Sequence, residues 1–530
     1  MKKVILFLAA MLMASTGLWA ETVKYIDADG QETTVDAAVV TDADELVTWG
    51  TAGTTTWYVV TGTEVTLSEG AVCVGDVRLI LADGAKLTAT GDETAGIQVS
   101  GDGNALTIYG QTGHLGQLFA IGGFYAAGIG GKNFVSGSNI TINGGRVTAI
   151  GGEGAAGIGG GCNEWGYDIT INGGRVMAIG GEGAAGIGGG KGGSSANIKV
   201  STTLLVKADA GNPPTTLIEN SGGNLAKILG GKQCVNILPT VCAAYIDANG
   251  NTKEVKAVEI ESSDTSVVWS NGWYVVNEAN VTLSKGAICI GEVHLILADG
   301  AKLTATGDET AGIQVSGEGN SLTIYGQTGQ TGQLIATGDN NAAGIGGGNY
   351  RPGSNITING GVVTATGGNS ASGIGGGNYG SSSNIWVSTT LLVKADKVNP
   401  PVEEIDHDGG DIALKLKDKR YVIIEPIRPY RDAAIAAINA AFEGVTNEIM
   451  KAIANNAKTS IEAAITTKAI DAIKEKALAD LQIYDVGKAD ALGSLGTEQT
   501  GPAVKVTDKD GKAVILYAPK KVEYIKVNEK

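Results

Sequence analysis

The chain has 530 residues, more than one ordinary domain needs, and 39 Lys and Arg against 55 Asp and Glu give it a net charge of −16. This acidic balance argues against nucleic acid or an anionic membrane surface as a partner. Glycine, with 82 residues, is about twice as frequent as usual. It follows no collagen-like period, and Ile, Leu and Val are too frequent for a disordered chain. Two or more glycine-rich folded domains are therefore expected.

The first residues have the pattern of a secretory signal peptide. Lys2 and Lys3 precede an apolar run from Val4 to Met13, and Ala20 ends the expected cleavage site. The run is too short to span a bilayer, and no other segment comes close, so no membrane insertion is expected. We therefore predict that residues 1–20 are removed on export and that the protein is secreted or lies at the cell surface.

Five cysteines are present. Cys73 and Cys289 occupy equivalent positions in apolar alternating segments and are expected to be buried thiols. Cys234 and Cys242 lie on either side of Pro239, and export would permit a disulfide between them, but the sequence leaves this pairing open. No Cys-x-x-Cys or Cys/His spacing indicates a metal site.

The most regular feature is a short repeating unit. NITINGGRVTAIGGEGAAGIGGG starts at Asn139, its next copy starts at Asp168 (168 − 139 = 29), and a related copy starts at Asn355. Each unit contains three short apolar-alternating pieces separated by glycine corners, which is typical of one coil of a parallel β-helix. The register predicts two inward ladders, formed by Ile129, Ile158 and Ile187 and by Ile345 and Ile374.

A longer repeat encloses these units. The block that starts at Glu64 returns nearly unchanged at Asn280, an offset of 216 in residue number. The closing segment NIKVSTTLLVKAD at Asn197 returns at Asn384, an offset of only 187. The two offsets differ by one repeating unit (216 − 187 = 29), so the first half contains one additional coil. We predict two tandem β-helix modules, residues 21–239 and 240–426, with the boundary near Pro239.

Each predicted module begins and ends outside the coil pattern. A hairpin with an Asp-Gly or Asn-Gly turn opens it, and a Trp-Tyr-Val-Val segment follows. Because a solenoid end exposes apolar core and unpaired strand edges, the Trp-Tyr segments are interpreted as caps and the closing segments as end strands. These features are the turns at Asp29-Gly30 and Asn249-Gly250, the segments at Trp57 and Trp273, and the strands that end at Pro239 and Pro426.

After Pro426 the composition changes. Glycine nearly vanishes, and apolar residues recur at helical spacing in three stripes up to Leu481. Thr446 and Thr467 are the predicted N-caps of the second and third helices. Residues 427–483 are therefore predicted to form a small helical bundle. Residues 484–530 return to alternation and are predicted to form a terminal β segment with a turn at Asp510-Gly511.

The sequence offers little for catalysis. Lyases and hydrolases on a β-helix need clustered carboxylates or acids around a calcium ion, whereas the predicted coils are nearly free of carboxylates. Asp92-Glu93 and Asp308-Glu309 recur at a coil corner and are calcium candidates without further ligands. No triad, acid pair or phosphate-binding loop can be assembled. We therefore expect no enzyme activity and, apart from that calcium candidate, no cofactor.

One feature points outward from the coils. The loop after each GIGG segment has an aromatic residue, and Tyr350 and Tyr379 are separated by one repeating unit, so successive coils would present them in line. Aromatic faces stack on sugar rings, and neighbouring amides reach hydroxyl groups. Alternatively, the rings fold back over the coil as a loop core. The candidate ligand-binding residues are Phe134, Trp165, Tyr167, Tyr350, Tyr379, Asn349 and Asn378.

The blocks VTLS, GDVRLILADGAKLTATG, LTIYGQTG, AAGIGGG and ITINGGRVTA resemble a group of secreted, glycine-rich β-helix repeat proteins of gut-dwelling bacteria. The resemblance covers residues 57–210 and 273–396 and implies an extracellular or surface placement, but no established activity or catalytic residue. A looser similarity to carbohydrate-binding β-helix proteins rests on architecture.

The sequence as a whole predicts a mainly β protein, with two tandem parallel β-helix modules followed by a small α-helical bundle and a short terminal β unit. The expected function is non-catalytic binding of a polysaccharide or a host glycan, or adhesion, at the cell surface. Two alternatives remain: a structural spacer or stalk whose C-terminal region contacts a partner, and a diverged polysaccharide lyase or hydrolase.

Overall fold

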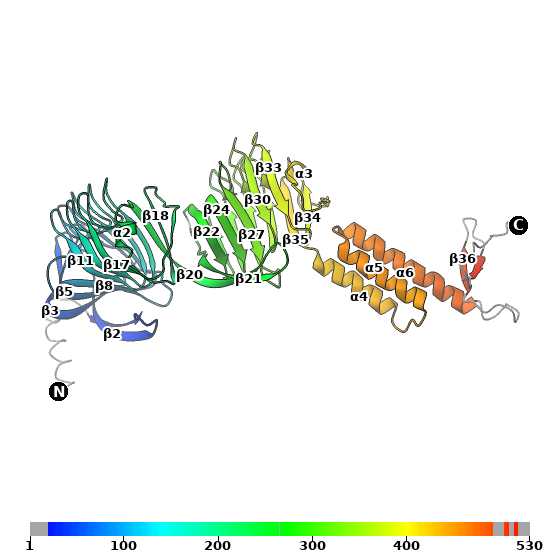
Figure 1. Ribbon diagram of the computed structural model, residues 1–530, viewed down its shortest axis with the longest axis horizontal. Helices are drawn as coiled ribbons and strands as arrows, with labels where there is room; N and C mark the ends of the chain where they lie inside the picture. The colour runs from blue at the N-terminus through cyan, green and yellow to red at the C-terminus, as the bar shows by residue number, and fades with distance from the viewer. Residues whose placement is uncertain (1–19, 264, 491–502, 508–512, 518–530) are drawn as a thin grey trace, which may run out of the picture.

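The computed structural model describes residues 20–263, 265–490, 503–507 and 513–517. The predicted signal peptide, apart from Ala20, and the predicted turn at Asp510-Gly511 lie outside the described residues. Two β solenoids and a helical bundle follow one another along the longest axis of the molecule (Figure 1). Residues 20–239 contribute the first solenoid and residues 240–426 the second, here named module 1 and module 2.

Three columns of parallel strands form module 1, and each turn of the chain adds one strand to each column. The register matches the sequence repeat: Ile129 pairs with Ile158, which pairs with Ile187, and all three side chains are fully buried. The first column contains β3 (Val47–Val60), β5 (Ala71–Leu81), β8 (Ala105–Gly110), β11 (Gly137–Ile142), β14 (Gly166–Ile171) and β17 (Ser195–Val200). The second contains β4 (Val65–Leu67), β6 (Lys86–Thr90), β9 (Gln117–Ile121), β12 (Arg146–Ile150), β15 (Arg175–Ile179) and β18 (Leu204–Asp209) with the short β19 (Leu217–Ile218). The third contains β7 (Ile97–Gln98), β10 (Ile129–Gly130), β13 (Ile158–Gly159) and β16 (Ile187–Gly188).

Module 2 repeats this plan with fewer coils. Ile345 pairs with Ile374, as the repeat predicts, and both are fully buried. Its first column contains β22 (Val267–Val276), β24 (Ala287–Leu297), β27 (Ser321–Gly326), β30 (Gly353–Ile358) and β33 (Ser382–Val387). Its other columns contain β23 (Val281–Leu283), β25 (Lys302–Thr306), β28 (Gln333–Thr337), β31 (Val362–Thr366) and β34 (Leu391–Asp396), and β26 (Ile313–Gln314), β29 (Ile345–Gly346) and β32 (Ile374–Gly375). The predicted fold class, a mainly β chain of parallel β-helix modules with a small helical region, is confirmed.

Glycine is required where the coils turn most tightly. Gly159 has a φ of +134°, and a Cβ atom there would lie 2.0 Å from the carbonyl oxygen of Gly188 on the next coil. No L side chain fits between two backbones at that separation. Successive coils can therefore stack at strand spacing only because this corner has no side chain.

An antiparallel hairpin opens each module. β1 (Ala20–Ile26) pairs with β2 (Glu32–Val39), and β20 (Cys234–Ile246) pairs with β21 (Thr252–Glu259), so the predicted turns are confirmed. Tyr25 of the first hairpin lies 4.8 Å from Trp57 and 4.9 Å from Tyr109, measured between ring centroids. Tyr245 contacts Trp273 in the same way in module 2. The Trp segments therefore anchor the hairpins to the outer face of the first coils.

The closing segments are not end strands, which corrects the sequence interpretation. β20 runs antiparallel between β15 and β18 and pairs with both of them. β35 (Tyr421–Pro426) takes the same position between β31 and β34. The short helices α2 (Ala226–Leu229) and α3 (Ala413–Leu416) precede these strands. The chain thus returns and inserts into the sheet, because an inserted strand satisfies ladder groups on two neighbours instead of one.

A single continuous strand joins the modules. Up to Pro239, β20 pairs with module 1, and from Thr240 onward it pairs with β21 of module 2. Cys234 and Cys242 are both free thiols; Cys234 begins this strand and Cys242 lies eight residues further along it. Eight residues of strand span about 27 Å, and a disulfide between these two cysteines is therefore geometrically excluded.

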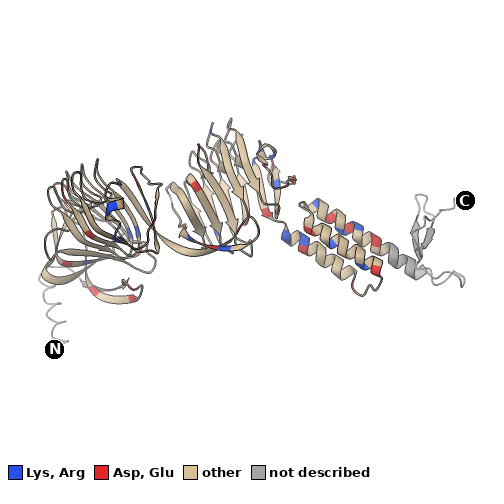
Figure 2. Cartoon of the chain, viewed as in Figure 1, with Lys and Arg blue, Asp and Glu red and all other residues tan. Residues whose placement is uncertain are grey.

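The helical region is a three-helix bundle of α4 (Arg428–Ala441), α5 (Glu448–Ala463) and α6 (Thr467–Asp490), so the last helix extends past residue 483. Its apolar core includes Ile438, Ile461 and Ile470 and is continuous with Leu392 of module 2. Figure 2 shows that charged residues are much denser on these helices than on the solenoid strands. β36 (Ala503–Thr507) and β37 (Ala513–Tyr517) form an antiparallel pair beyond the bundle.

The predicted helix N-caps are each wrong by one residue. The side chain of Asn447, not Thr446, accepts hydrogen bonds from the backbone N–H groups of the first turn of α5. Thr466 Oγ1 accepts from the backbone N–H of Ala469 at 3.2 Å, whereas the hydroxyl of Thr467 donates to Glu404 of module 2. Thr467 therefore ties the bundle to module 2 and leaves the cap to its neighbour.

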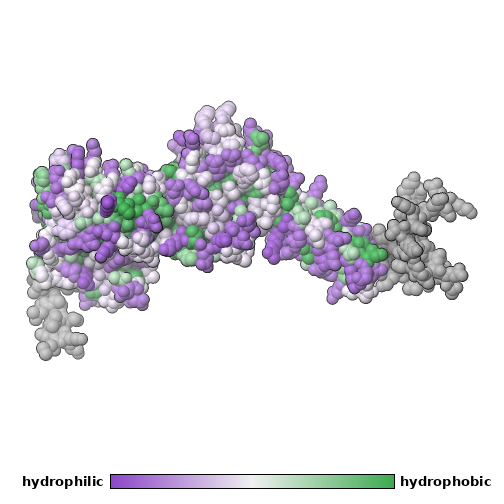
Figure 3. Space-filling model, viewed as in Figure 1, coloured by the Kyte–Doolittle hydropathy of each residue, from purple (hydrophilic) through white to green (hydrophobic). Residues whose placement is uncertain are grey.

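The two solenoids keep their apolar residues inside. The cores of both modules consist mainly of fully buried Ile, Leu, Val and Ala. Most of the surface visible in Figure 3 is correspondingly hydrophilic or neutral. Within the described ranges, no helix has both the length and the apolar composition that crossing a membrane requires.

Candidate functional site

The most exposed pair of aromatic side chains in the described part of the chain lies on one edge of module 2. Tyr350 is 69% exposed and Tyr379 is 84% exposed, and their rings are parallel within 6° with centroids 5.7 Å apart. The backbone N–H of Tyr350 donates to the carbonyl oxygen of Asn378 at 3.0 Å, which fixes the two loops relative to each other. We name this pair the tyrosine edge. Since both rings project into solvent, they do not form a loop core.

The backbone of the tyrosine edge is left-handed, as it is at several corners of both modules. Tyr350 and Tyr379 have φ values of +58° and +59°, in the left-handed region that bulky residues rarely adopt. Such strain costs about 1–3 kcal/mol per residue. Phe134, Asn163 and Gly192 also have positive φ at the corresponding position of three coils of module 1, so this conformation belongs to the coil corner. Both tyrosines thus stand at positions where glycine would be less strained.

Amide side chains accompany the tyrosine edge. Asn349 is exposed and Asn378 is partly buried, each directly before one of the tyrosines. The backbone N–H of Asn378 donates to the carbonyl oxygen of Asn341 at 2.8 Å. These contacts use the backbone, so the amide groups contribute hydrogen-bonding capacity next to the rings.

Module 1 does not assemble the same edge. Phe134 is 65% exposed with a φ of +56°, but the next two coils place Asn163 and Gly192 in register with it. Trp165, which is 51% exposed, comes two residues later in its coil. Tyr167 is partly buried inside β14, where it pairs with Ser138 and Ala196, and does not lie in the loop. The candidate residues of module 1 are therefore separate side chains.

Sequence reasoning missed a further aromatic pair. Phe124 is 62% exposed, and its ring centroid lies 4.0 Å from that of Tyr125, which has a φ of +61°. The signal was present in the repeat, because the unit has Gly-Phe-Tyr where the two following coils have Gly-Glu-Gly.

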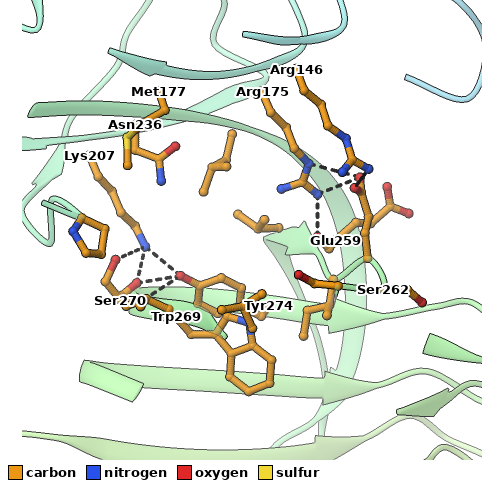
Figure 4. A pocket seen from close by; sticks show the side chains of 18 of the residues that line it. Arg146, Arg175, Met177, Lys207, Asn236, Glu259, Ser262, Trp269, Ser270 and Tyr274 are labelled. Carbon is orange, nitrogen blue, oxygen red and sulfur yellow. Dashed lines mark hydrogen bonds and ion pairs between the residues drawn. The ribbon is translucent and has the colours of Figure 1, made fainter. Parts of the chain in front are cut away.

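A second feature, a cavity of about 450 Å³, lies between the two modules. On one side of it, Arg175 donates to Glu261 Oε1 at 3.0 Å and to the carbonyl oxygen of Glu259 at 2.8 Å, and Arg146 binds the other oxygen of Glu261 (Figure 4). Both arginines belong to module 1, at the same position of successive coils, and Glu261 belongs to module 2. The shared carboxylate therefore connects the modules.

Lys207 stands on the other side of the cavity (Figure 4). Its side chain is 1% exposed, and Nζ donates to Ser270 Oγ at 3.1 Å, to Tyr274 Oη at 2.9 Å and to the backbone carbonyl oxygen of Ser270. Burial lowers the pKa of Lys207 to about 8, and burial likewise raises the pKa of Tyr274 to about 12. Perturbed pKa values in a cleft mark functional-site candidates. Neither the cavity nor Lys207 was predicted from the sequence.

The calcium candidates gain no support from their surroundings. Asp308 pairs with Lys285 at 2.8 Å, so a cation is already supplied by the chain at that corner. Among the described residues, no group of three or more His, Cys, Asp or Glu side chains has an arrangement that could hold a metal ion.

Comparisons with known proteins agree with the fold. The β helix repeat family model matches residues 140–162, 169–191 and 356–378, which lie in three coils of the two modules. No curated protein and no solved structure matches the chain. The chain is thus a β-helix repeat protein, and because this architecture also occurs in lyases and hydrolases, the fold does not decide between binding and catalysis.

Proposed function

We propose that this protein is a non-catalytic, exported β-helix protein that binds a polysaccharide or a host glycan at the cell surface through the tyrosine edge. The observation that carries the proposal is the parallel, highly exposed pair Tyr350 and Tyr379. Each ring offers an apolar face with a polar hydroxyl group, and Asn349 and Asn378 stand beside them. This combination fits sugar rings, which have apolar faces and peripheral hydroxyl groups.

The spacing of the edge favours an extended ligand. The two rings lie one coil apart along the solenoid axis, so a chain molecule that follows this axis contacts both of them.

Affinity gel electrophoresis and a glycan array test the proposal with residues 21–530. We expect retardation by at least one polysaccharide and its loss in the double variant Tyr350→Ala with Tyr379→Ala. The matched control is Trp386→Ala, which removes an aromatic side chain 43% exposed on β33 of the same module and should leave retardation unchanged. Equal retardation of the double variant and the parent protein would show that the tyrosine edge is not the contact.

The elongated arrangement in Figure 1 favours a second candidate function, a spacer or stalk. In that case the solenoids set a distance and the C-terminal region contacts the partner. Binding that persists in the double tyrosine variant, but is lost when the chain is ended after residue 426, would support this role.

The proposed absence of catalysis has its own test. Incubation with uronate-containing and neutral polysaccharides, across pH and with or without calcium, should release no shorter products. Any chain cleavage that is saturable in substrate would contradict the non-catalytic role.

A further inference from the structure

The two modules contain equivalent lysines with different partners. Lys207 and Lys394 occupy the same position in the two copies of the segment STTLLVKAD. Lys394 Nζ donates to Glu425 Oε1 at 2.9 Å and approaches Tyr430 Oη at 3.4 Å. The acceptors of Lys207 are all neutral, namely two oxygens of Ser270 and the hydroxyl of Tyr274. Lys207 of module 1 is thus buried without a carboxylate partner, whereas Lys394 of module 2 has Glu425.

A single residue difference accounts for the carboxylate that Lys207 lacks. Leu238 of β20 occupies the position that Glu425 occupies in β35, since Leu238 pairs with Leu205 as Glu425 pairs with Leu392. Leu238 and Lys207 both line the cavity. The cavity therefore borders Leu238, the position in module 1 that is equivalent to Glu425 in module 2.

The electrostatic consequence differs between the two lysines. Burial acts to lower the pKa of Lys394, but the hydrogen bonds to Glu425 and Tyr430 reverse this, so the pKa of Lys394 is raised. Lys207 has only the burial effect, and its pKa is lowered. A buried charge without a carboxylate is costly, and an anion from outside would offset that cost.

The other charged groups of the cavity do not supply this anion. Glu261 is shared by Arg146 and Arg175, and the carboxylate of Glu259 accepts from the amide of Asn277. Arg146 Nε is buried and has no hydrogen-bond partner. One cationic group therefore remains without a carboxylate in contact, in a chain whose net charge is −16.

The cavity also contains groups that suit the rest of a sugar. Asn236 lies beside Lys207 in the strand register, and its side-chain amide has no hydrogen-bond partner among the described residues. Met177 and Leu238 add apolar wall. The volume, about 450 Å³, falls within the range of small-ligand pockets, which often lie between domains.

We propose that the cavity between the modules binds an acidic sugar, a saccharide residue with one carboxylate. All three N–H groups of Lys207 already donate to neutral acceptors, so the carboxylate replaces one of these acceptors. It then takes the position equivalent to that of Glu425 in module 2, and the hydroxyl groups reach Asn236. This site is separate from the tyrosine edge and does not depend on it. Its occupation would add a contact between the modules, because the cavity walls come from both of them.

Isothermal titration calorimetry at pH 7 on residues 21–530 tests the site with sodium glucuronate, glucose and sodium acetate. We expect saturable binding of glucuronate, no binding of glucose, and binding of acetate at least tenfold weaker. Lys207→Met should weaken glucuronate binding at least tenfold. Leu238→Glu should do the same while keeping the lysine, because it supplies the carboxylate from within the chain. Lys394→Met is the control and should leave glucuronate binding unchanged.

Three results would overturn the proposal. The first is that glucuronate fails to bind. The second is that it binds equally to the parent protein and to Lys207→Met and Leu238→Glu, with both variants shown by circular dichroism to be folded. The third is that acetate binds as tightly as glucuronate, which would show an anion site with no selectivity for a sugar. The double variant Tyr350→Ala with Tyr379→Ala separates the two proposals, because it should bind glucuronate normally even if polysaccharide retardation is lost.

Discussion

Replacement of the buried lysine at the module junction, Lys207→Met, should stabilise the protein at neutral pH. Burial lowers the pKa of Lys207 from 10.5 to about 8. One pKa unit corresponds to about 1.4 kcal/mol, so keeping this side chain charged in the folded protein at pH 7 costs about 3 kcal/mol. Methionine has a similar shape and no charge to desolvate.

The hydrogen-bond partners of Lys207 remain satisfied without it. The carbonyl oxygen of Ser270 also accepts from Tyr274 Oη at 2.9 Å, and that hydroxyl accepts from the backbone N–H of Ser270 at 2.9 Å. Ser270 Oγ donates to the carbonyl oxygen of Pro214 at 3.3 Å. Since no buried group is orphaned, we expect a net gain of about 1–3 kcal/mol in the free energy of unfolding.

The pH dependence gives the sign of this effect. The pKa of Lys207 is lower in the folded than in the unfolded protein, so its penalty is complete below pH 8, shrinks as the pH rises from about 8 to 10.5, and vanishes above that range. Tyr274 stays protonated throughout this range, because burial raises its pKa to about 12. The other charged side chains of the cavity, Arg146, Arg175 and Glu261, pair with one another and not with Lys207. The advantage of the variant should therefore disappear near pH 10.5.

Urea unfolding, followed by tryptophan fluorescence at several pH values between 7 and 10.5, measures this difference. A variant that is less stable than the parent protein at pH 7, or a difference that does not change with pH, would refute the reasoning. Lys394→Met is the matched control with the opposite sign. The pKa of Lys394 is raised, so its stabilising contribution is present at pH 7 and is lost only above pH 10.5. The control should therefore be less stable than the parent protein at pH 7.

Three further predictions concern the coils and the thiols. Gly159→Ala should lower the free energy of unfolding by more than about 4 kcal/mol or prevent folding, because the new Cβ would lie 2.0 Å from a carbonyl oxygen of the next coil. Gly84→Ala should lower it by only about 1–2 kcal/mol, because Gly84 has a φ of +80° but no atom within 4 Å of the new Cβ. Urea midpoints of the two variants compare these costs, and equal midpoints would contradict the tight stacking of the corners. Ile169→Ala, at a fully buried ladder position, should lower the free energy of unfolding by about 2–5 kcal/mol, and a loss below about 1 kcal/mol would argue against a packed core there. Under native conditions a thiol reagent should label Cys242 alone, since the other four cysteines are buried, and mass spectrometry showing a second rapid label would disagree with the fold.

The sequence predicted only part of the candidate aromatic site. The spacing of the repeat was enough to place Tyr350 and Tyr379 side by side, because strands of successive coils pair residue by residue. The same reasoning did not separate Phe134 from Trp165, which lie near each other in the repeat but in different registers. Trp165 stands two residues later in its coil than Phe134 does, so the two side chains do not align between coils. The backbone hydrogen bonds of the loops, which the sequence does not show, fix this register.

The exact helix N-caps were also not determined by the sequence. Asn447 and Thr466 each stand next to the residue that the sequence favoured. Adjacent polar residues all have capping propensity, and the tertiary contact of Thr467 with Glu404 decides which of them caps α6.

The sequence by itself determined the coil, its length, its inward isoleucines and the number of modules, because a solenoid repeats the same local interactions with its nearest neighbours only. Only the tertiary structure showed that β20 and β35 insert between strands, and that Lys207 is buried against Ser270 without a carboxylate. The strand insertions depend on a return of the chain within each module, and the burial of Lys207 depends on how module 1 meets module 2. Their partners are far apart in the chain and follow no repeat, so no local pattern records them.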